Sequence, residues 1–462
     1  MNSSKPTDPA ARVAFVTLGC PKNQVDTEEM MGQLAAAGFA LVALPEEAEV
    51  VVVNTCAFVR AAQQESIGQI LELAGGPALL VVAGCLAERH GPELTREIPE
   101  IAGVLGPGRT ADVVELVRAA LRRESPVALG GFHAREPASG PRMRIGEPHT
   151  AYVKIAEGCD HACTFCLIPS LRGPLRSRAP ESIREELARL GDEGVREAIL
   201  VAQDTTAYGR DLPGRPSLAG LLRELRDAPG PAWIRVLYTH PDRWTDELIV
   251  LLAEDGRVLP YIDLSIQHCA DPVLRAMGRG PAGTRIRRLI DRLRARVPHL
   301  VLRATVMTGH PGEGADEFEQ LLRFLGEFPF DRLGVFAYSP EPETRAASLP
   351  RVNRREALRR RAELLRRQRE VVLPLQRQRL GQTIDVLTEA WDGRHHRLLG
   401  RSYGEAPEID GRVRIRIPRG IDGAAFELGV FHPVRIVGAG AYDFDAISLS
   451  PAASRGTRKA RG

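Results

Sequence analysis

The stretch Glu157–Arg172 reads EGCDHACTFCLIPSLR and carries three cysteines in a C-x3-C-x2-C pattern, Cys159, Cys163 and Cys166. Three thiolates at this spacing can bind three corners of a 4Fe-4S cluster and leave the fourth iron without a protein ligand. An open metal position is typical of catalytic rather than structural sites. Gly158 gives the backbone the freedom to turn into the loop. We therefore predict a catalytic iron–sulfur cluster here.

Two other uses of these cysteines are possible, a zinc knuckle and a disulfide pair. Zinc requires a fourth Cys or His at a similar short spacing, and His161 lies inside the loop, where it cannot complete a tetrahedron. Seven cysteines in 462 residues are too few for a disulfide scaffold, and an odd number cannot all pair within one chain. Reduced thiols suit a cluster better.

Three further cysteines, Cys20, Cys56 and Cys85, each follow an apolar run that reads as a buried strand. Their separations, 56 − 20 = 36 and 85 − 56 = 29 residues, each correspond to one strand–helix unit. The carboxyl ends of parallel strands meet at one rim, where α/β sheets bind ligands. A lone cysteine after a strand is usually a small hydrophobic residue, but three in succession predict a second cluster. The seventh cysteine, Cys269, belongs to neither triad, and we interpret it as a structural or barrel-lining thiol.

The composition is that of a globular protein of two or three domains, with 44% hydrophobic and 26% charged residues. No apolar run approaches the ~20 residues of a membrane helix, and the N-terminus MNSSKPTDPA has no signal-peptide core. We expect a cytoplasmic protein. Only 4 of 62 basic residues are lysine, a bias that also follows from GC-rich coding, so arginine counts alone do not indicate nucleic-acid binding.

Residues 12–125 alternate apolar strands with helical patterns and predict a doubly wound parallel α/β domain. Asp26 with Glu29 three residues later predicts a capping box at the first helix. Residues 126–149 are rich in Pro, Gly, Arg and Glu and indicate a linker.

Residues 150–375 contain six strand candidates, AYVKIA, EAILVA, AWIRVLY, YIDLSI, LVLRATVM and LGVFAY, separated by amphipathic helices. Six βα repeats are too few to close a TIM barrel and predict an open, partial barrel. Polar residues at the strand ends, among them Gln203, Arg303 and Tyr338, should face its cavity.

An arginine-rich helix is predicted from Asn353 to Leu373, broken by Pro374. Residues 351–380 carry 11 Arg and 3 Glu, 11 − 3 = +8; the helix could touch ribosomal RNA, but a solvated face is the commoner fate of such a run. Residues 380–448 change to short β patterns and predict a small antiparallel β-barrel. The tail 449–462 is basic and expected to be disordered.

The cysteine loop, with Phe165 before its third cysteine, resembles the radical S-adenosylmethionine (SAM) signature. The flanking words KIAEGC and IPSLRG resemble the radical SAM methylthiotransferase family, as do GCPKNQVDTEE, NTCAFV, GCLAER, AQDTTAYGRD, SIQH, GHPGE, FAYSPEPET and GRSYGEAPEIDG, in this order from Arg12 to about Leu449. GCPKN, AQDTT and APEIDG are most similar to the RimO branch. His310 and Glu343 depart from the family, which commonly has Phe and Gly there.

The resemblance implies a transferase with an auxiliary 4Fe-4S cluster on Cys20, Cys56 and Cys85, and a radical SAM cluster on the other triad. It implies a C-terminal TRAM domain, which is OB-like, and SAM as methyl donor and radical source, with Gln203, Arg303 and Tyr338 as candidate SAM contacts. The expected reaction adds a methylthio group to the β-carbon of an aspartate in protein twelve of the small ribosomal subunit. An electron donor such as flavodoxin or ferredoxin and a sulfide source are implied partners, with no membrane.

Three alternatives stay open: a tRNA methylthiotransferase acting on a modified adenosine, an electron-transfer or structural iron–sulfur protein, and a nucleic-acid-binding module. Electron-transfer clusters usually have four protein ligands each, and a binding module does not explain the cysteines. Residues 381–447 carry 8 Arg against 10 Asp plus Glu, 8 − 10 = −2, the wrong sign for gripping phosphates. The segment GEAPEIDG predicts Glu405, Glu408 and Asp410 as an acidic surface for a basic ribosomal protein, unless it is simply a solvated turn.

Overall fold

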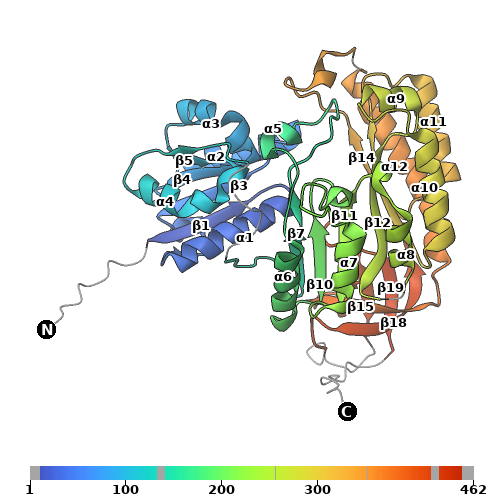
Figure 1. Ribbon diagram of the computed structural model, residues 1–462. Helices are drawn as coiled ribbons and strands as arrows, with labels where there is room; N and C mark the ends of the chain where they lie inside the picture. Colours follow the sequence, from blue (N-terminus) through green and yellow to red (C-terminus); the bar gives the residue numbers. More distant parts are fainter. Residues whose placement is uncertain (1–10, 133–140, 255, 351, 418–425, 450–462) are drawn as a thin grey trace.

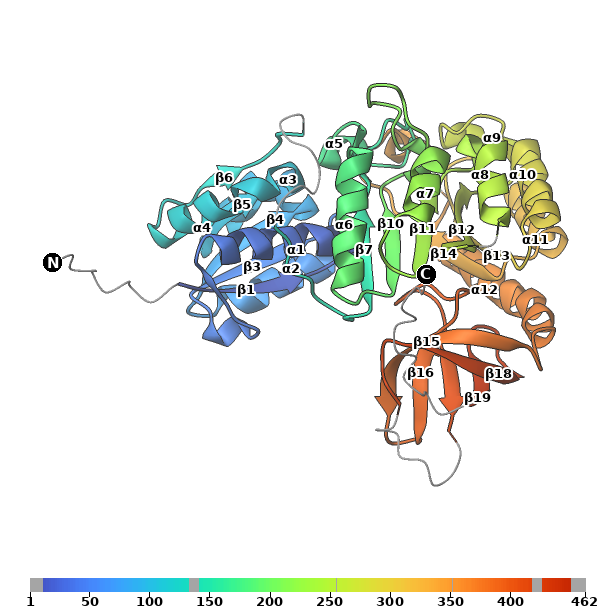
Figure 2. The ribbon, with the colours of Figure 1, turned by 60° about the horizontal axis from the view of Figure 1, so that its bottom comes forward.

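A computed structural model of the chain shows three units in sequence order (Figure 1). It describes residues 11–132, 141–254, 256–350, 352–417 and 426–449. The first two units each contain a six-stranded sheet, and the third is a closed five-stranded barrel. In Figure 2 the small barrel lies below the central unit, and the N-terminal unit lies beside it. The predicted fold class, an α/β protein with a C-terminal β-barrel, is confirmed.

The N-terminal sheet is parallel throughout, in the order β2-β1-β3-β4-β5-β6. Val50 and Val52 pack into the core on one face, whereas Val51 and Val53 pack into the core on the other, so the strand is apolar at every position. The sixth strand lies in the segment predicted as a linker. The strands are β1 (Arg12–Thr17), β2 (Ala40–Leu41), β3 (Val50–Thr55), β4 (Leu79–Gly84), β5 (Ile101–Leu105) and β6 (Val127–Ala128).

Helices cover both faces of this sheet, α1 (Pro21–Ala36) and α4 (Val113–Leu121) on one, α2 (Arg60–Ala74) and α3 (Cys85–Glu97) on the other. The predicted capping box is wrong, because α1 starts at Pro21. Proline suits the first helical position, where no N–H is needed. Short 3-10 turns are η1 (Pro45–Glu47) and η2 (Pro107–Asp112).

The central sheet is an open, parallel partial barrel with the order β14-β13-β12-β11-β10-β7, as predicted. A short antiparallel pair, β8 (Ala156–Glu157) and β9 (Arg176–Ser177), flanks the cysteine loop. The six strands are β7 (Thr150–Lys154), β10 (Glu197–Val201), β11 (Trp233–Thr239), β12 (Val258–Gln267), β13 (Val301–Thr308) and β14 (Arg332–Ala337).

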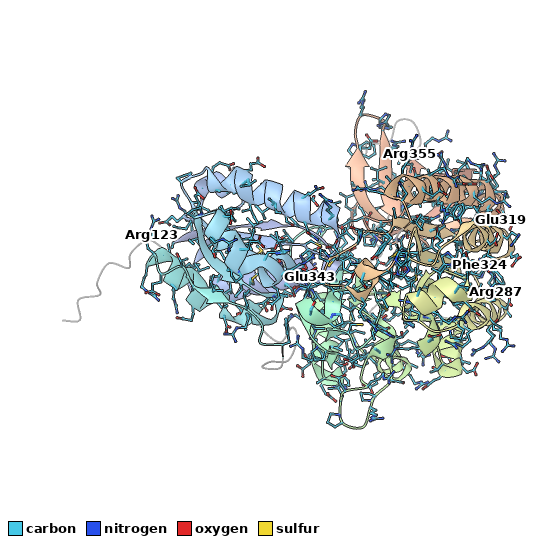
Figure 3. All side chains as sticks on the ribbon, turned by 90° about the horizontal axis from the view of Figure 1, so that it is seen from above. Arg123, Arg287, Glu319, Phe324, Glu343 and Arg355 are labelled. Carbon is cyan, nitrogen blue, oxygen red and sulfur yellow. The ribbon has the colours of Figure 1, made fainter. Side chains whose placement is uncertain are left out.

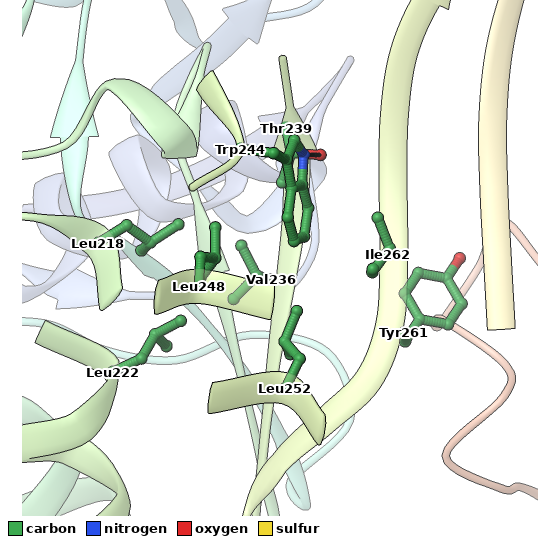
Figure 4. Close-up of a pocket in the computed structure, with 9 residues that line it drawn as sticks. All are labelled: Leu218, Leu222, Val236, Thr239, Trp244, Leu248, Leu252, Tyr261 and Ile262. Atoms are coloured by element: carbon green, nitrogen blue, oxygen red, sulfur yellow. Dashed lines mark hydrogen bonds between the residues drawn. The ribbon is translucent and has the colours of Figure 1, made fainter. Parts of the chain in front are cut away.

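Amphipathic helices bury their apolar stripes on the outside of the partial barrel. Figure 4 shows the leucines of α7 and α8 against β11, around an apolar cavity of about 10 Å³ that holds at most one water. The helices are α5 (Ile168–Arg172), α6 (Pro180–Asp192), α7 (Leu218–Asp227), α8 (Asp246–Ala253), α9 (Asp271–Ala276), α10 (Gly283–Arg296) and α11 (Ala315–Glu327), with 3-10 turns η3 (Thr205–Ala207), η4 (Pro241–Arg243) and η5 (Arg345–Ser348).

The arginine-rich helix α12 (Arg354–Arg377) packs Ala357 and Leu364 inward. The prediction that Pro374 breaks this helix is wrong, because the helix continues to Arg377. Only three residues follow that proline in the helix, so few backbone hydrogen bonds depend on it. On the outer face Arg359 pairs with glutamates at i−3 and i+4. Such pairs are typical of a solvated helix face.

The C-terminal unit closes in the order β15-β16-β17-β19-β18. Four of its pairs are antiparallel, as expected for the whole barrel, whereas β17 and β19 run parallel. The strands are β15 (Thr383–Asp392), β16 (Arg397–Arg401), β17 (Val413–Arg416), β18 (Phe431–Ala439) and β19 (Phe444–Ser448). Residues 450–462 of the predicted tail lie outside the described residues. Within the described ranges, no helix is long and apolar enough to cross a bilayer.

Candidate functional site

Cys20, Cys56 and Cys85 follow three neighbouring parallel strands, β1, β3 and β4, and lie at one rim of the N-terminal sheet. The first two loops approach so closely that a Cβ on Gly19 would lie 2.8 Å from Cys56 Cβ. Gly19 has a φ of 95°, a conformation that favours glycine. The spacing seen in the sequence therefore does bring these thiols together.

The environment of these thiols differs from one cysteine to the next. Burial raises the pKa of Cys85 to about 11 and also raises the pKa of Cys56. Burial acts in the same direction on Cys20, but the positive charges of Lys22 and Arg172 lower its pKa overall. Cations beside a thiol favour the thiolate, which is the metal-binding form.

The second triad lies on the loop that follows β8. Gly158 has a φ of 78°, and a Cβ there would lie 1.9 Å from the carbonyl oxygen of Pro174, so only glycine fits this turn. Burial raises the pKa of Cys159 to about 11 and that of Cys166 to about 12. His161 Nε2 bonds to Asp204 Oδ2 at 2.7 Å. Its imidazole therefore has a carboxylate partner that follows β10, and the prediction that His161 is no ligand stays a prediction.

The donor chemistry of both triads fits 4Fe-4S clusters. All seven cysteines are free thiols. Across the described ranges, no three Cys, His, Asp or Glu side chains converge on a single-ion position, the arrangement that zinc requires. In a cluster each cysteine binds a different iron, so three thiols in one loop or at one rim leave one iron open. Cys269 packs instead into the core of the central unit, where burial raises its pKa to about 12.

A buried ion network joins the two triads, and Arg172 is its centre. This arginine lies six positions after Cys166, and its side chain is 1% exposed. Its Nε donates to Cys85 Sγ at 3.4 Å, and its terminal nitrogens donate to Glu157 at 3.0 Å and Asp26 at 3.0 Å. One guanidinium therefore contacts a thiol of the first triad and a carboxylate two residues before the second.

Lys154 and Asn23 complete this network. Lys154 Nζ pairs with Asp26 and lies 3.0 Å from Glu157 Oε2, while Asn23 Oδ1 accepts from Arg172. Arg172 and Lys154 together hold the pKa of Glu157 well below its usual range, against the effect of burial. The charges balance within the network, as buried charges must.

The three candidate SAM contacts lie in different surroundings. Gln203 Nε2 bonds to Glu157, and its buried Oε1 has no hydrogen-bond partner in the described part of the chain. Tyr338 follows β14 and packs edge-on against His310, with ring centroids 5.1 Å apart. His310 in turn contacts Phe165 of the cysteine loop. Gln203 and Tyr338 thus border the loop, and their SAM contacts stay predictions.

Arg303 lies in the interior of β13, close to its first residue, and is paired within the protein. Its Nη1 is 2.9 Å from Asp410 Oδ1, and its Nε is 3.4 Å from Asp263 Oδ1. Tyr261 donates to Asp410 Oδ2 at 2.6 Å. The carboxylates neutralise this arginine without any ligand, so the geometry gives its predicted SAM contact no support.

The predicted acidic surface is wrong for two of its three carboxylates. Glu405 is fully buried and bonds to Arg332 at 2.9 Å, and Asp410 is held by Arg303. Both carboxylates attach the C-terminal barrel to the floor of the partial barrel, the end where its strands begin. They therefore cannot contact a partner protein. Glu408 is exposed, with a φ of 66°, and its substrate contact stays a prediction.

A second contact between units involves Glu343, one of the two departures from the family pattern. Arg89 of α3 pairs with Glu341 at 2.9 Å and with Glu343 at 2.5 Å. In Figure 3 Glu343 lies at the junction between the N-terminal unit and the rest of the molecule. The loop after β14 is therefore tied to the N-terminal unit.

A polar cavity of about 170 Å³ adjoins the cysteine loop and is lined by Cys159, His161, Asp204 and Arg243 among others. Sequence reasoning did not single out Asp204 or Arg243 as a pair, although Arg243 Nε lies 3.0 Å from Asp204 Oδ2. It also missed Arg172 and Lys22. Their only signals were their places in the words IPSLRG and GCPKN, where Arg172 precedes Gly173 and Lys22 follows Cys20 by two residues.

Comparisons with known proteins match three family models in succession. The uncharacterized protein family UPF0004 covers residues 12–106, the radical SAM superfamily 153–325 and the TRAM domain 380–447. The chain is 45% identical over 96% of its length to ribosomal protein uS12 methylthiotransferase RimO of Desulforudis audaxviator (strain MP104C), covering 98% of that protein. It is 43% identical to the protein of the same name from Anaeromyxobacter sp. (strain K), over 97% of this chain and 96% of that protein.

A solved structure shares the fold. The radical S-adenosylmethionine methyltransferase TsrM from Kitasatospora setae, solved with cobalamin and a [4Fe-4S] cluster, superposes with a TM-score of 0.52. The match covers 73% of this chain and 74% of that chain at 15% identity. At this identity the likeness concerns the fold alone.

Proposed function

The chain belongs to the family of ribosomal protein uS12 methylthiotransferases RimO, and on that premise we propose that it adds a methylthio group to the β-carbon of an aspartate in uS12. It is a radical SAM transferase with two 4Fe-4S clusters and SAM as cofactors. The observation that carries the proposal is the pair of cysteine triads held on either side of one buried network. Two open-site clusters in one chain suit a reaction that must both activate a C–H bond and deliver sulfur.

When bound, the clusters and SAM supply the radical, sulfur and methyl chemistry, and the protein supplies positioning and a dry site. Cys159, Cys163 and Cys166 would hold the radical SAM cluster, and Cys20, Cys56 and Cys85 the auxiliary cluster.

Arg172 holds the ligand-bearing segments of the two units together, because it contacts Cys85 and Glu157 at once. The orphaned Oε1 of Gln203 is a polar group available to SAM beside the loop. We place the electron donor, a flavodoxin or ferredoxin, and a sulfide source outside this chain.

The tRNA alternative is disfavoured by charge. Residues 381–447 carry 8 Arg against 10 Asp plus Glu. Without the buried Arg401, Glu405 and Asp410 the balance is 7 Arg against 8 acidic residues, whereas an RNA-binding barrel should be basic. Glu408 is exposed on this unit and suits a basic ribosomal protein, in keeping with its predicted substrate contact. uS12 acts in the cytoplasm with the ribosome, so we place the enzyme there too.

A gene-deletion comparison tests the proposal. Ribosomal proteins from cells with and without this gene are compared by intact-protein mass spectrometry, and we expect uS12 alone to lose the mass of one methylthio group that replaces hydrogen. An unchanged uS12 together with loss of a methylthio adenosine from tRNA would overturn the proposal in favour of the tRNA branch.

A further inference from the structure

Lys22 is a largely buried lysine beside the Cys20 thiol, and no carboxylate pairs with it in the part of the chain that the structure describes. It lies in the first turn of α1, two residues after Cys20, and is 8% exposed. Its Nζ makes no ion pair or hydrogen bond with any described residue and lies 3.5 Å from the centroid of the Tyr238 ring. A buried charge is costly unless it is paired. Lys154, the other lysine of the described chain, shows the usual solution, because two carboxylates hold it.

The neighbouring carboxylates are already used elsewhere. The Cys20 thiol and the carboxylates of Glu157 and Asp263 are the acidic groups whose charges act on Lys22, and none of the three hydrogen-bonds to its Nζ. Glu157 is held by Lys154 and Arg172, while Asp263 accepts from the backbone N–H of Tyr238 at 3.0 Å and lies beside Arg303. Lys22 therefore keeps its hydrogen-bonding capacity for an anion that comes from outside the chain.

The aromatic ring beneath Lys22 belongs to a residue with an unusual backbone conformation. Tyr238 stands near the carboxyl end of β11 with a φ of 62°, where the pairing with β12 is irregular. A bulky residue in this region of backbone space stores strain, and such strain clusters at functional sites. Tyr238 is half-buried, so its ring borders solvent. Figure 1 shows α1 beside β7, the edge strand of the central sheet, and the contact with Tyr238 places Lys22 against β11 of the same sheet.

We propose that Lys22 binds the side-chain carboxylate of the target aspartate in uS12. An ammonium–carboxylate hydrogen bond is charge-assisted and among the stronger polar contacts. The β-carbon is bonded directly to that carboxylate, so fixing the carboxylate fixes the carbon that receives the methylthio group. Because Lys22 lies two residues after Cys20, this contact brings the substrate carbon to the N-terminal cysteine triad. This inference rests on the proposed function and names the residue that selects its substrate.

A binding experiment separates this role from others. The affinity of reconstituted enzyme for uS12, and for uS12 with the target aspartate replaced by asparagine, is measured for wild type, Lys22→Gln, Lys22→Met and Lys22→Arg. We expect wild type to prefer the aspartate form by about 10- to 100-fold, the range of hydrogen bonds to charged groups. Both neutral variants should bind the two forms equally, and Lys22→Arg should keep part of the preference. Arg12→Gln, which removes an exposed positive charge from the same unit, should keep all of it.

Iron content and the reduction potential of each cluster are measured on the same samples. A full aspartate preference in Lys22→Gln and Lys22→Met would overturn the proposal. So would an equal loss of affinity for both forms, or failure of both neutral variants to retain iron, since Lys22 would then serve the cluster or the fold. A wild type that modifies uS12 without any aspartate preference also overturns it and leaves the proposed function intact. A wild type that neither binds nor modifies uS12 removes the proposed function itself.

Discussion

Replacing Arg172 with Met should strongly destabilise the protein even without its clusters. The guanidinium is 1% exposed and bonds to Glu157, Asp26, Asn23 and Cys85. Its removal leaves two buried carboxylates with Lys154 as their only cation in the network. Breaking a buried ion pair by removing one partner costs about 3–5 kcal/mol. For units of this size that corresponds to a fall of about 10 °C in the unfolding midpoint.

The assay is thermal unfolding of iron-free, reduced protein, followed by circular dichroism, so that loss of a cluster does not contribute. Arg172→Lys keeps the charge but not the planar fork, and we expect it to fall between wild type and Arg172→Met. Arg122→Met is the control, because its ion pair with Glu124 is exposed and such pairs contribute little to stability. A midpoint for Arg172→Met as close to wild type as that of the control would refute the reasoning that this network joins the units.

Other predictions concern the clusters, the domain contact and pH. After reconstitution, Cys56→Ala should bind about four irons, whereas wild type and Cys269→Ala should each bind about eight, because each triad holds one cluster. A full iron count in Cys56→Ala would contradict the assignment. Glu405→Gln should lower the free energy of unfolding by about 3 kcal/mol and expose the C-terminal barrel to proteolysis, whereas Glu408→Gln, an exposed site, should change it by less than about 0.5 kcal/mol. Burial raises the pKa of Glu29 to about 7, so the contribution of this side chain to stability is greatest below pH 4.5 and is lost as the pH rises through 7. Glu29→Gln should therefore be more stable than wild type at pH 8 by up to about 3 kcal/mol, with little difference at pH 5. Denaturant unfolding at the two pH values measures this difference.

The placement of the six cysteines could be predicted because it depends on topology. Parallel strands separated by one helix end at the same rim, so thiols after β1, β3 and β4 must be neighbours whatever the detail of the loops. The C-x3-C-x2-C loop is local and needs no knowledge of the fold. For the same reason the open six-stranded barrel followed from counting apolar runs.

The charged residues could not be predicted, because their partners are far away in sequence. Asp26 resembles a helix cap, but Lys154 lies 128 residues away and draws it into a buried network. Glu405 and Asp410 resemble an exposed acidic turn, yet arginines on β13 and β14 hold them at the floor of the partial barrel. A run of acidic residues in a sequence does not indicate whether their side chains are buried. An exposed surface was therefore predicted where the structure has a contact between domains.

The most direct test of the central claim is one reaction mixture with two substrates. The anaerobically reconstituted protein is incubated with SAM, sulfide and a reductant, together with uS12 and unmodified tRNA in equal amounts, and both products are analysed by mass spectrometry. We predict a methylthio group on one aspartate of uS12 and none on tRNA. Methylthiolation of adenosine in the tRNA, with uS12 unchanged, would contradict the claim.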